Sequence, residues 1–500
     1  MNFYSLIESI VKSKPTNVAI KSSAKQVISY RELDQQVSRY ALALDARGAC
    51  PGDRIIVQVD KSLPSLFLYL ACLKAGYVFV PLNTAYKSTE LTHFIADAEP
   101  KLFVTSSDRY DEASALVAAI KGCSAVILAG DSDRDLFGLA ARQSSSSLVR
   151  LANPDDVAVI IYTSGTTGRS KGAMVTHHNL VSNVNVLTSL WRFSEHDTLL
   201  HALPVFHVHG LFVANHCVLS VGASMLWLTR FDVEEIIDAI PQSTVMMGVP
   251  TFYTRLLSDD KLTADLCRNM RLFISGSAPM LSETHDLFEQ RTGHRILERY
   301  GMSEAGMITS NSYDGARKVG TVGLPLPGVS VRIVDDADLS VAQGITGHIQ
   351  IKGPNVFLGY RNMPEKTQEE FTDEGWFRTG DLGVLDGDTY LTIVGRSKDL
   401  IITGGYNVYL KEIELILDDE PGVFESAVFG VKHPDFGEAV TAVVVPNPNA
   451  RLDPESLIEA LKIKLASYKV PKAIRVVTQL PRNAMGKVQK SLLRDAYKSD

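Results

Sequence analysis

The feature that most constrains the fold of this 500-residue sequence is an alternation of short apolar runs with longer helical patterns. Runs of five or six residues rich in β-branched and aromatic side chains are typical of buried strands. They occur at Arg54–Val59, Tyr77–Leu82, Lys101–Thr105, Ser124–Leu128 and Val157–Tyr162. Tyr30–Arg47 and Leu63–Ala75 show the spacing of amphipathic helices. Because helices that alternate with strands cover parallel sheets, the sequence predicts an α/β fold.

The chain is too long for one domain, since a single hydrophobic core stops growing at roughly 250–300 residues. After Pro327, Val/Ile-rich runs with Gly and Asp turns predict a β-rich subdomain, with strands at Val329–Val334, Gly347–Lys352 and Tyr390–Val394. The last hundred residues predict a separate α+β unit, with strands at Ser426–Val431 and Ala439–Val445 and helices at Leu410–Asp418 and Pro454–Leu465. We place the boundary near Arg396–Lys398, which gives domains of residues 1–396 and 397–500.

Composition excludes several classes of protein. The formal net charge of −7 gives no support for nucleic-acid binding. The first residues lack a basic stretch followed by an apolar core, and no apolar run reaches the roughly 20 residues that span a bilayer. We therefore expect a cytoplasmic protein without a membrane partner. The five cysteines have no CxxC spacing, so we interpret them as buried small hydrophobes. The oligomeric state is left open.

The segment Tyr162–Gly172 indicates which chemistry the protein performs. It follows an apolar strand and contains three glycines, five Ser/Thr hydroxyls and two cations, Arg169 and Lys171. Glycines let backbone N–H groups approach a polyphosphate, hydroxyls add donors, and the cations offset phosphate charge. The Gly-Lys-Ser/Thr ending of the Walker A loop is absent. An ordinary Ser/Thr/Gly-rich surface loop has the same composition. The order of the residues therefore has to distinguish a phosphate-binding loop from such a surface loop.

In that order, Tyr162–Gly172 resembles the phosphate-binding signature of the acyl-adenylate-forming superfamily, which includes acyl-CoA synthetases. Four further segments resemble its other motifs, in the order that the superfamily has them. They are Tyr300–Glu304, Phe377–Asp381, Gly395–Asp399 and Pro481–Lys487. The resemblance spans essentially the whole chain, and it implies a large adenylation domain, a small mobile C-terminal domain, and the use of ATP, Mg²⁺ and coenzyme A.

The resemblance also implies roles for single residues. Glu304 is expected to hold Mg²⁺ together with Thr163, and Asp381 to accept hydrogen bonds from both ribose hydroxyls. The ATP-binding residues that it implies are Thr163, Ser164, Gly165, Thr166, Thr167, Gly168, Lys171, Gly276, Ser277, Ala278, Tyr300, Gly301, Met302, Ser303, Asp381 and Arg396. Ser303 stands where the superfamily usually has threonine, which keeps the hydroxyl.

Other roles lie near the C-terminus. Lys487 is expected to contact the substrate carboxylate and the α-phosphate, which makes Lys487, Thr163 and Glu304 the catalytic set. Lys398 matches the hinge about which the small domain turns between the two half-reactions. The residues expected along the passage for coenzyme A are Gly404, Gly405 and Tyr406. A Gly-Gly pair is equally at home in an ordinary turn, so this last assignment stays open.

Arg299 bears on the identity of the acid. It stands directly before Tyr300, and a buried guanidinium at that place needs an anionic partner. A second carboxylate on the substrate could supply it, and so could a structural ion pair with Glu298 or another acid of the protein. The stretches around Arg299, Arg255 and His207 resemble malonyl-CoA synthetases, which implies that malonate is activated as malonyl-adenylate and transferred to coenzyme A. The expected substrate-binding residues are His207, Arg255, Arg299 and Ser275.

Three other functions compete with this one. The first is a ligase for methylmalonate, succinate or a short fatty acid. Departures from the usual pattern leave methylmalonate open, and they are Val208, Ala305, Gly306 and Ile308. The second is an enzyme that loads a separate carrier protein, and the third is a binding-only homologue. The presence of Lys171, Glu304, Asp381 and Lys487 favours an enzyme over the third.

Overall fold

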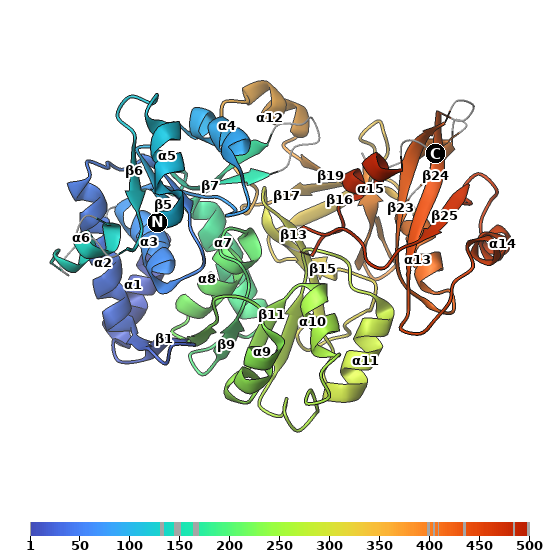
Figure 1. The fold of residues 1–500 in the computed structure, drawn as a ribbon, viewed down its shortest axis with the longest axis horizontal. Helices are drawn as coiled ribbons and strands as arrows, with labels where there is room; N and C mark the ends of the chain where they lie inside the picture. Colours follow the sequence, from blue (N-terminus) through green and yellow to red (C-terminus); the bar gives the residue numbers. More distant parts are fainter. Residues whose placement is uncertain are drawn as a thin grey trace.

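The structure, a computed structural model, describes residues 2–130, 135–144, 152–163, 170–397, 401–403, 406–408, 410–433, 437–483 and 486–497. Figure 1 shows a large body and a smaller unit that contains the C-terminus at one end of the long axis. The predicted α/β class with a small second unit is confirmed.

Within the described residues, a seven-stranded sheet holds the five strands predicted in the first third of the chain. In spatial order it comprises β18 (Gly359–Tyr360), β8 (Lys171–Thr176), β7 (Val157–Thr163), β4 (Val78–Pro81), β3 (Arg54–Gln58), β5 (Leu102–Thr105) and β6 (Ser124–Ile127). The run from β7 to β6 is parallel, as predicted, whereas β8 and β18 are antiparallel to their neighbours.

A second sheet has nine strands in the described part of the chain. In spatial order it comprises β15 (Leu324–Pro325), β14 (Gly306–Ser310), β13 (Leu297–Met302), β12 (Leu272–Ser275), β11 (Val245–Gly248), β9 (Thr198–His201), β10 (Ser224–Trp227), β1 (Val18–Ser22) and β2 (Val27–Ser29). Strands β13, β12, β11, β9 and β10 are parallel, so their carboxyl ends lie at one edge of the sheet.

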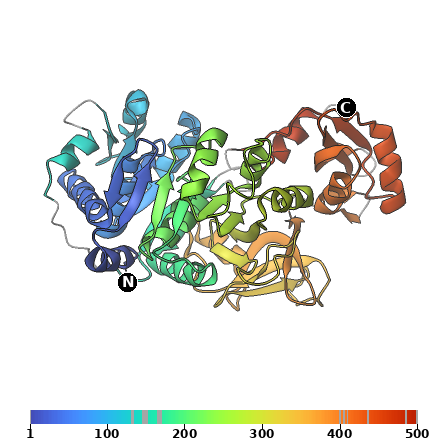
Figure 2. The ribbon, with the colours of Figure 1, turned by 90° about the horizontal axis from the view of Figure 1, so that it is seen from below.

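Helices cover both sheets, as Figures 1 and 2 show. In the large body they are α1 (Tyr4–Ser13), α2 (Tyr30–Ala46), α3 (Leu63–Ala75), α4 (Ser88–Ala98), α5 (Tyr110–Val117), α6 (Leu136–Ala141), α7 (His177–Leu190), α8 (Asn215–Leu219), α9 (Val233–Ala239), α10 (Pro250–Leu256), α11 (Ser282–Thr292) and α12 (Pro364–Glu370). Three further helical segments in the described residues are η1 (Ser107–Arg109), η2 (His209–Ala214) and η3 (Ile240–Gln242).

Local sequence signals explain where several helices begin and end. Ser29 accepts a hydrogen bond from the backbone of Glu32 and caps α2, and Thr176 caps α7 in the same way. Helix α3 ends at Gly76, whose φ is +75°. The amphipathic pattern expected for α3 is wrong, because every residue of Ser65–Ala75 is buried. A helix that is apolar on all faces belongs inside a core.

The β-rich subdomain forms where it was predicted. Its four antiparallel strands are β16 (Ser330–Val334), β17 (Gly347–Lys352), β19 (Phe377–Leu385) and β20 (Leu391–Arg396). In Figure 2 these yellow and orange strands lie below the green part of the large body. The last strand runs two residues beyond the predicted end, which brings Arg396 opposite Asp381.

The C-terminal unit has its own apolar cores. Its described strands are β21 (Ile401–Thr403), β22 (Tyr406–Val408), β23 (Val423–His433), β24 (Gly437–Pro446) and β25 (Ala473–Val476), and its helices are α13 (Leu410–Asp418), α14 (Pro454–Lys464) and α15 (Lys490–Ala496). The α+β composition predicted for this unit is confirmed. None of the helices in the described parts of the chain combines the length and the apolar character of a membrane span.

Candidate active site

A strained turn marks one edge of the nine-stranded sheet. Strand β12 ends at Ser275, and the turn Gly276–Ala278 that follows holds Ser277 at a φ of +73°. A residue other than glycine in this conformation costs about 1 kcal/mol or more, and such strain is concentrated at functional sites. Ligands of open α/β sheets bind outside the carboxyl ends of the strands, which is where this turn lies.

Arg299 on β13 lies against this turn. The side chain is buried, with 3% of the residue exposed, and its Nε and Nη2 atoms have no hydrogen-bond partner among the described residues. A methyl group on Gly276 would lie 2.5 Å from the Arg299 Cζ atom, so only glycine leaves room for the guanidinium. Burial lowers the pKa of Arg299 to about 9. A charged group held in this way requires an anion.

Glu298 does not provide that anion. Its carboxylate is 2.8 Å from Nε2 of His285, and its Oε2 accepts a hydrogen bond from the backbone of Met280. Successive side chains of a strand point to opposite faces, which separates Glu298 from Arg299. The alternative in which Arg299 forms a structural ion pair with Glu298 is therefore wrong for the described contacts.

Three more polar side chains in this part of the fold carry unpartnered atoms. Within the described residues, Nδ1 of His207, both ring nitrogens of His209 and Oγ of Ser275 have no hydrogen-bond partner. Burial, with the charges of Arg299 and Lys487, lowers the pKa of His207 to about 4. Burial and Arg299 hold the pKa of His209 well below its usual value. Buried polar atoms rarely lack partners, so these neutral imidazoles and the guanidinium form a candidate anion site.

The backbone behind His209 is unusual. His209 begins η2, a π-helical turn of the kind that is frequent at functional sites. Gly210 follows, and a methyl group there would lie 2.1 Å from the carbonyl oxygen of Pro204. His201 donates from Nε2 to the Gly210 carbonyl at 3.0 Å, and Lys61 lies 2.9 Å from His201 Nδ1. The sequence reasoning missed these supports, although a second histidine two residues after His207 was a visible signal.

The residues expected to hold the triphosphate meet at Tyr360. Its hydroxyl donates to Oε1 of Glu304 at 3.0 Å, and the Lys171 ammonium lies 4.1 Å from the centre of its ring. Thr163 at the end of β7 pairs with Lys171 across the β7–β8 hairpin. Burial raises the pKa of Glu304, whereas the Tyr360 hydrogen bond opposes that shift. Tyr360 belongs to none of the motifs, so sequence reasoning missed it.

The hairpin of β13 and β14 carries Tyr300–Glu304. Gly301 is fixed by packing, because a methyl group there would lie 2.3 Å from the Gly306 carbonyl oxygen. The hydroxyl of Tyr300 donates to Oδ2 of Asp381, and Arg396 Nε lies 3.0 Å from Oδ1. Asp381 is thus a buried carboxylate fixed from two sides, and its remaining lone pairs suit the two hydroxyls of a ribose.

Lys487 comes to this site from the C-terminal unit. The residue is exposed, and its charge contributes to the lowered pKa of His207 on the large domain. Next to it, Gly486 has a φ of +73°, and a methyl group there would lie 2.9 Å from Oγ1 of Thr251 in α10. The loop that carries Lys487 is therefore docked on the start of α10, close to the candidate anion site.

The remaining predicted residues are placed less fully. Arg255 is exposed on α10, and no described contact joins it to Arg299 or His207, so its role stays a prediction. Tyr406 begins β22, and nothing further is described of it. The predicted residues that lie outside the described part of the chain are Ser164, Gly165, Thr166, Thr167, Gly168, Lys398, Gly404 and Gly405.

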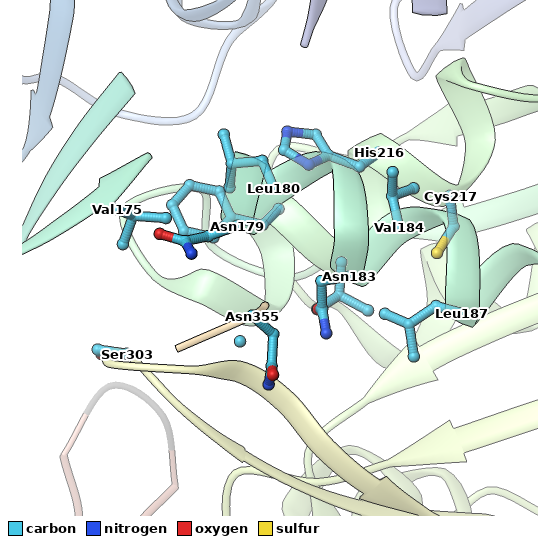
Figure 3. Close-up of a pocket in the computed structure, with 13 residues that line it drawn as sticks. Val175, Asn179, Leu180, Asn183, Val184, Leu187, His216, Cys217, Ser303 and Asn355 are labelled. Carbon is cyan, nitrogen blue, oxygen red and sulfur yellow. The ribbon is translucent and has the colours of Figure 1, made fainter. Parts of the chain in front are cut away.

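A small pocket adjoins the β13–β14 turn, between α7 and the η2–α8 segment (Figure 3). Its lining includes Ser303, Gly306, Asn183, Val213 and Asn355. The cavity of about 20 Å³ has room for about one water molecule, not for an aromatic ring.

The donors present fit the groups expected here. Glu304 is a buried carboxylate with a single tyrosine donor, and Mg²⁺ commonly takes one or two carboxylates together with substrate phosphates. In the described ranges, no cluster of three His, Cys, Asp or Glu side chains could hold a metal by itself.

The two-sheet body, the docked loop that carries Lys487 and the buried Asp381 carboxylate are features expected of a nucleotide-dependent, acid-activating class of protein. The chain belongs to the AMP-binding enzyme family, which it matches over residues 7–361, and residues 412–487 match the AMP-binding enzyme C-terminal domain. It is 37% identical to a malonate–CoA ligase of Arabidopsis thaliana over 90% of this chain and 79% of the relative. A feruloyl-CoA synthase of Amycolatopsis is 36% identical over 94% of both chains.

The fold also matches a solved structure over its full length. ATP-bound MatB from Rhodopseudomonas palustris superposes with a TM-score of 0.96 and 50% sequence identity, covering 100% of this chain and 99% of MatB.

Proposed function

We propose that this protein is an acid:thiol ligase that converts malonate, ATP and coenzyme A into malonyl-CoA, AMP and pyrophosphate through malonyl-adenylate. The observation that carries the proposal is Arg299, a buried guanidinium whose Nε and Nη2 lack partners among the described residues. A dicarboxylic acid has one carboxylate to react and one to pair with Arg299, whereas a monocarboxylic acid leaves the buried charge unpaired at a cost of several kcal/mol.

The histidines suit the same anion. With a pKa of about 4, His207 is neutral at physiological pH and can donate one N–H to a carboxylate without adding a third positive charge. His209, also neutral, and the hydroxyl of Ser275 add further donors. We assign the distal carboxylate of malonate to Arg299, His207 and Ser275, and we retain Arg255 as a candidate from the sequence.

Adenylation needs one oxygen of the reacting carboxylate to attack the α-phosphorus of ATP while pyrophosphate leaves. We assign Lys487 to the charge that develops between the carboxylate and the α-phosphate, and Lys171 to the leaving phosphates. A Mg²⁺ ion, when bound, would supply further positive charge at the phosphates, and Glu304 and Thr163 are the residues that would hold it. No protein nucleophile is required, because both reactants come from the substrates.

The other assignments follow the motifs. Asp381 holds the ribose, with Arg396 beside it. The phosphate loop comprises Thr163–Gly168, and the adenosine and α-phosphate contacts come from Gly276–Ala278 and Tyr300–Ser303. Coenzyme A passes Gly404, Gly405 and Tyr406 after residues 397–500 turn about Lys398 on residues 1–396. We propose that the protein acts on these small molecules in the cytoplasm.

Relatives and geometry together favour a small diacid. The relative from Arabidopsis is named as a malonate–CoA ligase, and the one from Amycolatopsis as a feruloyl-CoA synthase. Ferulate is an aromatic acid with a single carboxylate, which is the reacting group. It therefore has no second carboxylate for Arg299.

The test is product formation from a panel of acids. Purified protein is given ATP, Mg²⁺ and coenzyme A with acetate, propionate, malonate, methylmalonate, succinate or ferulate, and acyl-CoA products are identified by mass spectrometry. We expect malonyl-CoA as the main product, and kcat/KM for malonate about 100-fold lower in Arg299→Met, which corresponds to about 3 kcal/mol. Arg295→Met is the matched control, because Arg295 is a surface arginine paired with Glu289.

Other outcomes would assign another function. Turnover of acetate or propionate that is indifferent to Arg299→Met would retain the ligase and exclude malonate. Succinate, which is longer, should fail by length. Pyrophosphate release without an acyl-CoA product, followed by loading of a phosphopantetheine carrier, would indicate a carrier-loading enzyme. ATP binding without pyrophosphate release for any acid would indicate a binding-only protein.

A further inference from the structure

Tyr360 stands between two charged residues that come from distant parts of the chain. Its hydroxyl donates to Glu304 at 3.0 Å, and its ring lies under the Lys171 ammonium at 4.1 Å from the ring centre. All three residues are buried. The two charged groups are the ones assigned above to Mg²⁺ and to the leaving phosphates, whereas Tyr360 has no role in the motifs.

Strand pairing places the ring beside Lys171. In β18, Tyr360 is directly opposite Ala173 of β8. Lys171 is two residues from Ala173 on the same strand, and residues two apart share one face of a sheet. The backbone N–H of Arg361 donates to the carbonyl of Gly172 at 2.8 Å and continues this pairing.

The backbone at Gly359 and Tyr360 is fixed by packing on α12. Gly359 has a φ of +142°, and a methyl group there would lie 2.7 Å from Cγ2 of Thr367. The hydroxyl of Thr367 accepts a hydrogen bond from the Tyr360 backbone at 2.9 Å. Phe357 packs edge-on against the Tyr360 ring, with centroids 4.8 Å apart. The tyrosine therefore has little freedom to move away.

The same segment also ties down the turn that carries Glu304. The backbone N–H of Phe357 donates to the Glu304 carbonyl at 2.7 Å, and the side-chain amide of Asn355 donates to the Ala305 carbonyl at 2.8 Å. Glu304 is thus held at its backbone carbonyl by Phe357 and at its carboxylate Oε1 atom by Tyr360. Such supports orient a metal-binding carboxylate.

Lys171 has a second support on its other side. Oε1 of Glu370, at the end of α12, lies 3.5 Å from Lys171 Nζ and 3.1 Å from Lys366 Nζ. The ring of Tyr360 and the carboxylate of Glu370 therefore both stabilise the buried ammonium, the first through its π face. A substitution of Glu370 therefore removes a contact of Lys171 and leaves the Tyr360 hydrogen bond to Glu304 in place.

We propose that Tyr360 is a positioning residue that sets Glu304 through its hydroxyl and Lys171 through its ring, so that one side chain couples magnesium binding to triphosphate binding. The inference rests on the proposed function, because it takes Glu304 as the magnesium ligand and Lys171 as the phosphate contact. It adds a residue that acts on both through separate atoms, and separate variants can therefore test the two actions.

The experiment measures binding rather than turnover. The nucleotide used is α,β-methylene-ATP, which cannot transfer its adenylyl group to an acid. Its affinity is determined by titration calorimetry in EDTA and across a series of free Mg²⁺ concentrations. In Tyr360→Phe the ring stays and the hydroxyl is lost. We expect a rise of about 10-fold in the Mg²⁺ concentration that gives half of the maximal increase in nucleotide affinity. The nucleotide affinity in EDTA should stay unchanged within about 2-fold. In Tyr360→Leu the affinity in EDTA should also fall, by about 3- to 10-fold.

Two further variants complete the design. Glu370→Gln should change the affinity in EDTA and leave the Mg²⁺ dependence as in the wild type. Tyr4→Phe is the matched control, since it removes another buried tyrosine hydroxyl that donates to a carboxylate, Asp34, in α1 and α2. Tyr4→Phe should lower the melting temperature without any effect on nucleotide or Mg²⁺ affinity. Melting curves are recorded for the wild type and all four variants, and Tyr360→Phe decides the matter if Tyr360→Leu does not fold.

The outcomes separate cleanly. The proposal is overturned if Tyr360→Phe behaves like Tyr4→Phe, with a lower melting temperature and an unchanged Mg²⁺ dependence, because Tyr360 is then a structural residue only. It is also overturned if wild-type nucleotide affinity has no Mg²⁺ dependence. Malonyl-CoA formation is assayed separately, so that a failed acid panel with intact Mg²⁺ coupling would sink the proposed function and leave the role of Tyr360 standing.

Discussion

The guanidinium of Arg299 lies so close to Gly276 that a methyl group on the glycine would be 2.5 Å from Cζ and from Nη1. Both atoms are far inside van der Waals distance, so Gly276→Ala must displace the arginine. We expect kcat/KM for malonate to fall by about 10- to 100-fold, because a shift of about 1 Å in a positioning group costs that much. Steady-state kinetics with varied malonate measures it.

The control for this glycine is Gly387→Ala, since a methyl group at Gly387 meets nothing within 4 Å. We expect Gly387→Ala to retain wild-type kinetics. Equal losses in both variants would mean that the proximity of Gly276 to Arg299 does not matter for the reaction.

Removing the charge of Arg299 should stabilise the folded protein. The pKa of about 9 means that the folded state disfavours the protonated guanidinium. Arg299→Met removes the guanidinium and keeps an unbranched apolar side chain in place of the arginine stem, and we expect the free energy of unfolding at pH 7 to rise by about 1–4 kcal/mol. Urea denaturation without substrates measures it. Arg295→Met, at the surface, should change it by less than about 0.5 kcal/mol.

The same charge predicts a pH dependence. Arg299 has a lowered pKa in the folded state, so between about pH 9 and its ordinary value the unfolded chain binds more protons. Wild-type stability therefore gains from this group as the pH rises through 9, and the excess stability of Arg299→Met should shrink. Denaturation of both proteins at pH 7, 8.5 and 10 tests it. A constant difference across this range would show that Arg299 keeps its proton.

The docking of the Lys487 loop should respond to the contact of Gly486 with Thr251. Gly486→Ala places a methyl group 2.9 Å from Thr251 Oγ1, at a φ of +73° that alanine disfavours. We expect malonate-dependent pyrophosphate exchange to slow by at least about 10-fold, with a smaller effect on CoA capture from preformed malonyl-adenylate.

A double mutant separates the two causes. Thr251→Ala removes the opposing atoms, so Gly486→Ala with Thr251→Ala should recover the steric part of the loss and retain the backbone part. A double mutant that is as slow as Gly486→Ala alone would assign the whole effect to backbone strain.

Thiol chemistry tests the burial of the cysteines. The interpretation of all five cysteines as buried is wrong for Cys50, which is exposed, and Cys123 is only partly buried. Cys72, Cys217 and Cys267 are buried, as predicted. Burial raises the pKa of Cys123 and of Cys267 to about 11, which leaves little thiolate at pH 8. We expect one thiol to react rapidly with a disulfide reagent at pH 8, and Cys50→Ser to abolish that phase. A fast phase of two or more equivalents would contradict the burial.

Much of the fold was predictable because its signals are local. The apolar runs at Arg54–Val59 and Val157–Tyr162 became β3 and β7 with end shifts of one residue. The Leu63–Ala75 helix has its predicted limits, but its burial on all faces was missed. Hydrophobic spacing reports the conformation of one segment, whereas burial depends on which sheets pack on both sides of it.

The candidate site divides in the same way. Arg299 is buried, as its place before Tyr300 suggested, and Glu298 points away because adjacent residues of a strand face opposite sides. A reading that treats neighbours in sequence as neighbours in space cannot make that distinction. Arg255 was a second candidate arginine in the sequence, and the structure leaves it exposed.

By itself the sequence determined the class of chemistry, since the order of glycines, hydroxyls and charged residues in the five motifs is a property of the chain. Only the tertiary structure decided which groups meet. Tyr360 reaches Glu304 and Lys171 because β18 adds to the edge of β8, and Gly276 makes room for Arg299 because β12 and β13 are neighbours. Such pairs depend on strand register and on packing between segments far apart in the sequence, which no local pattern encodes.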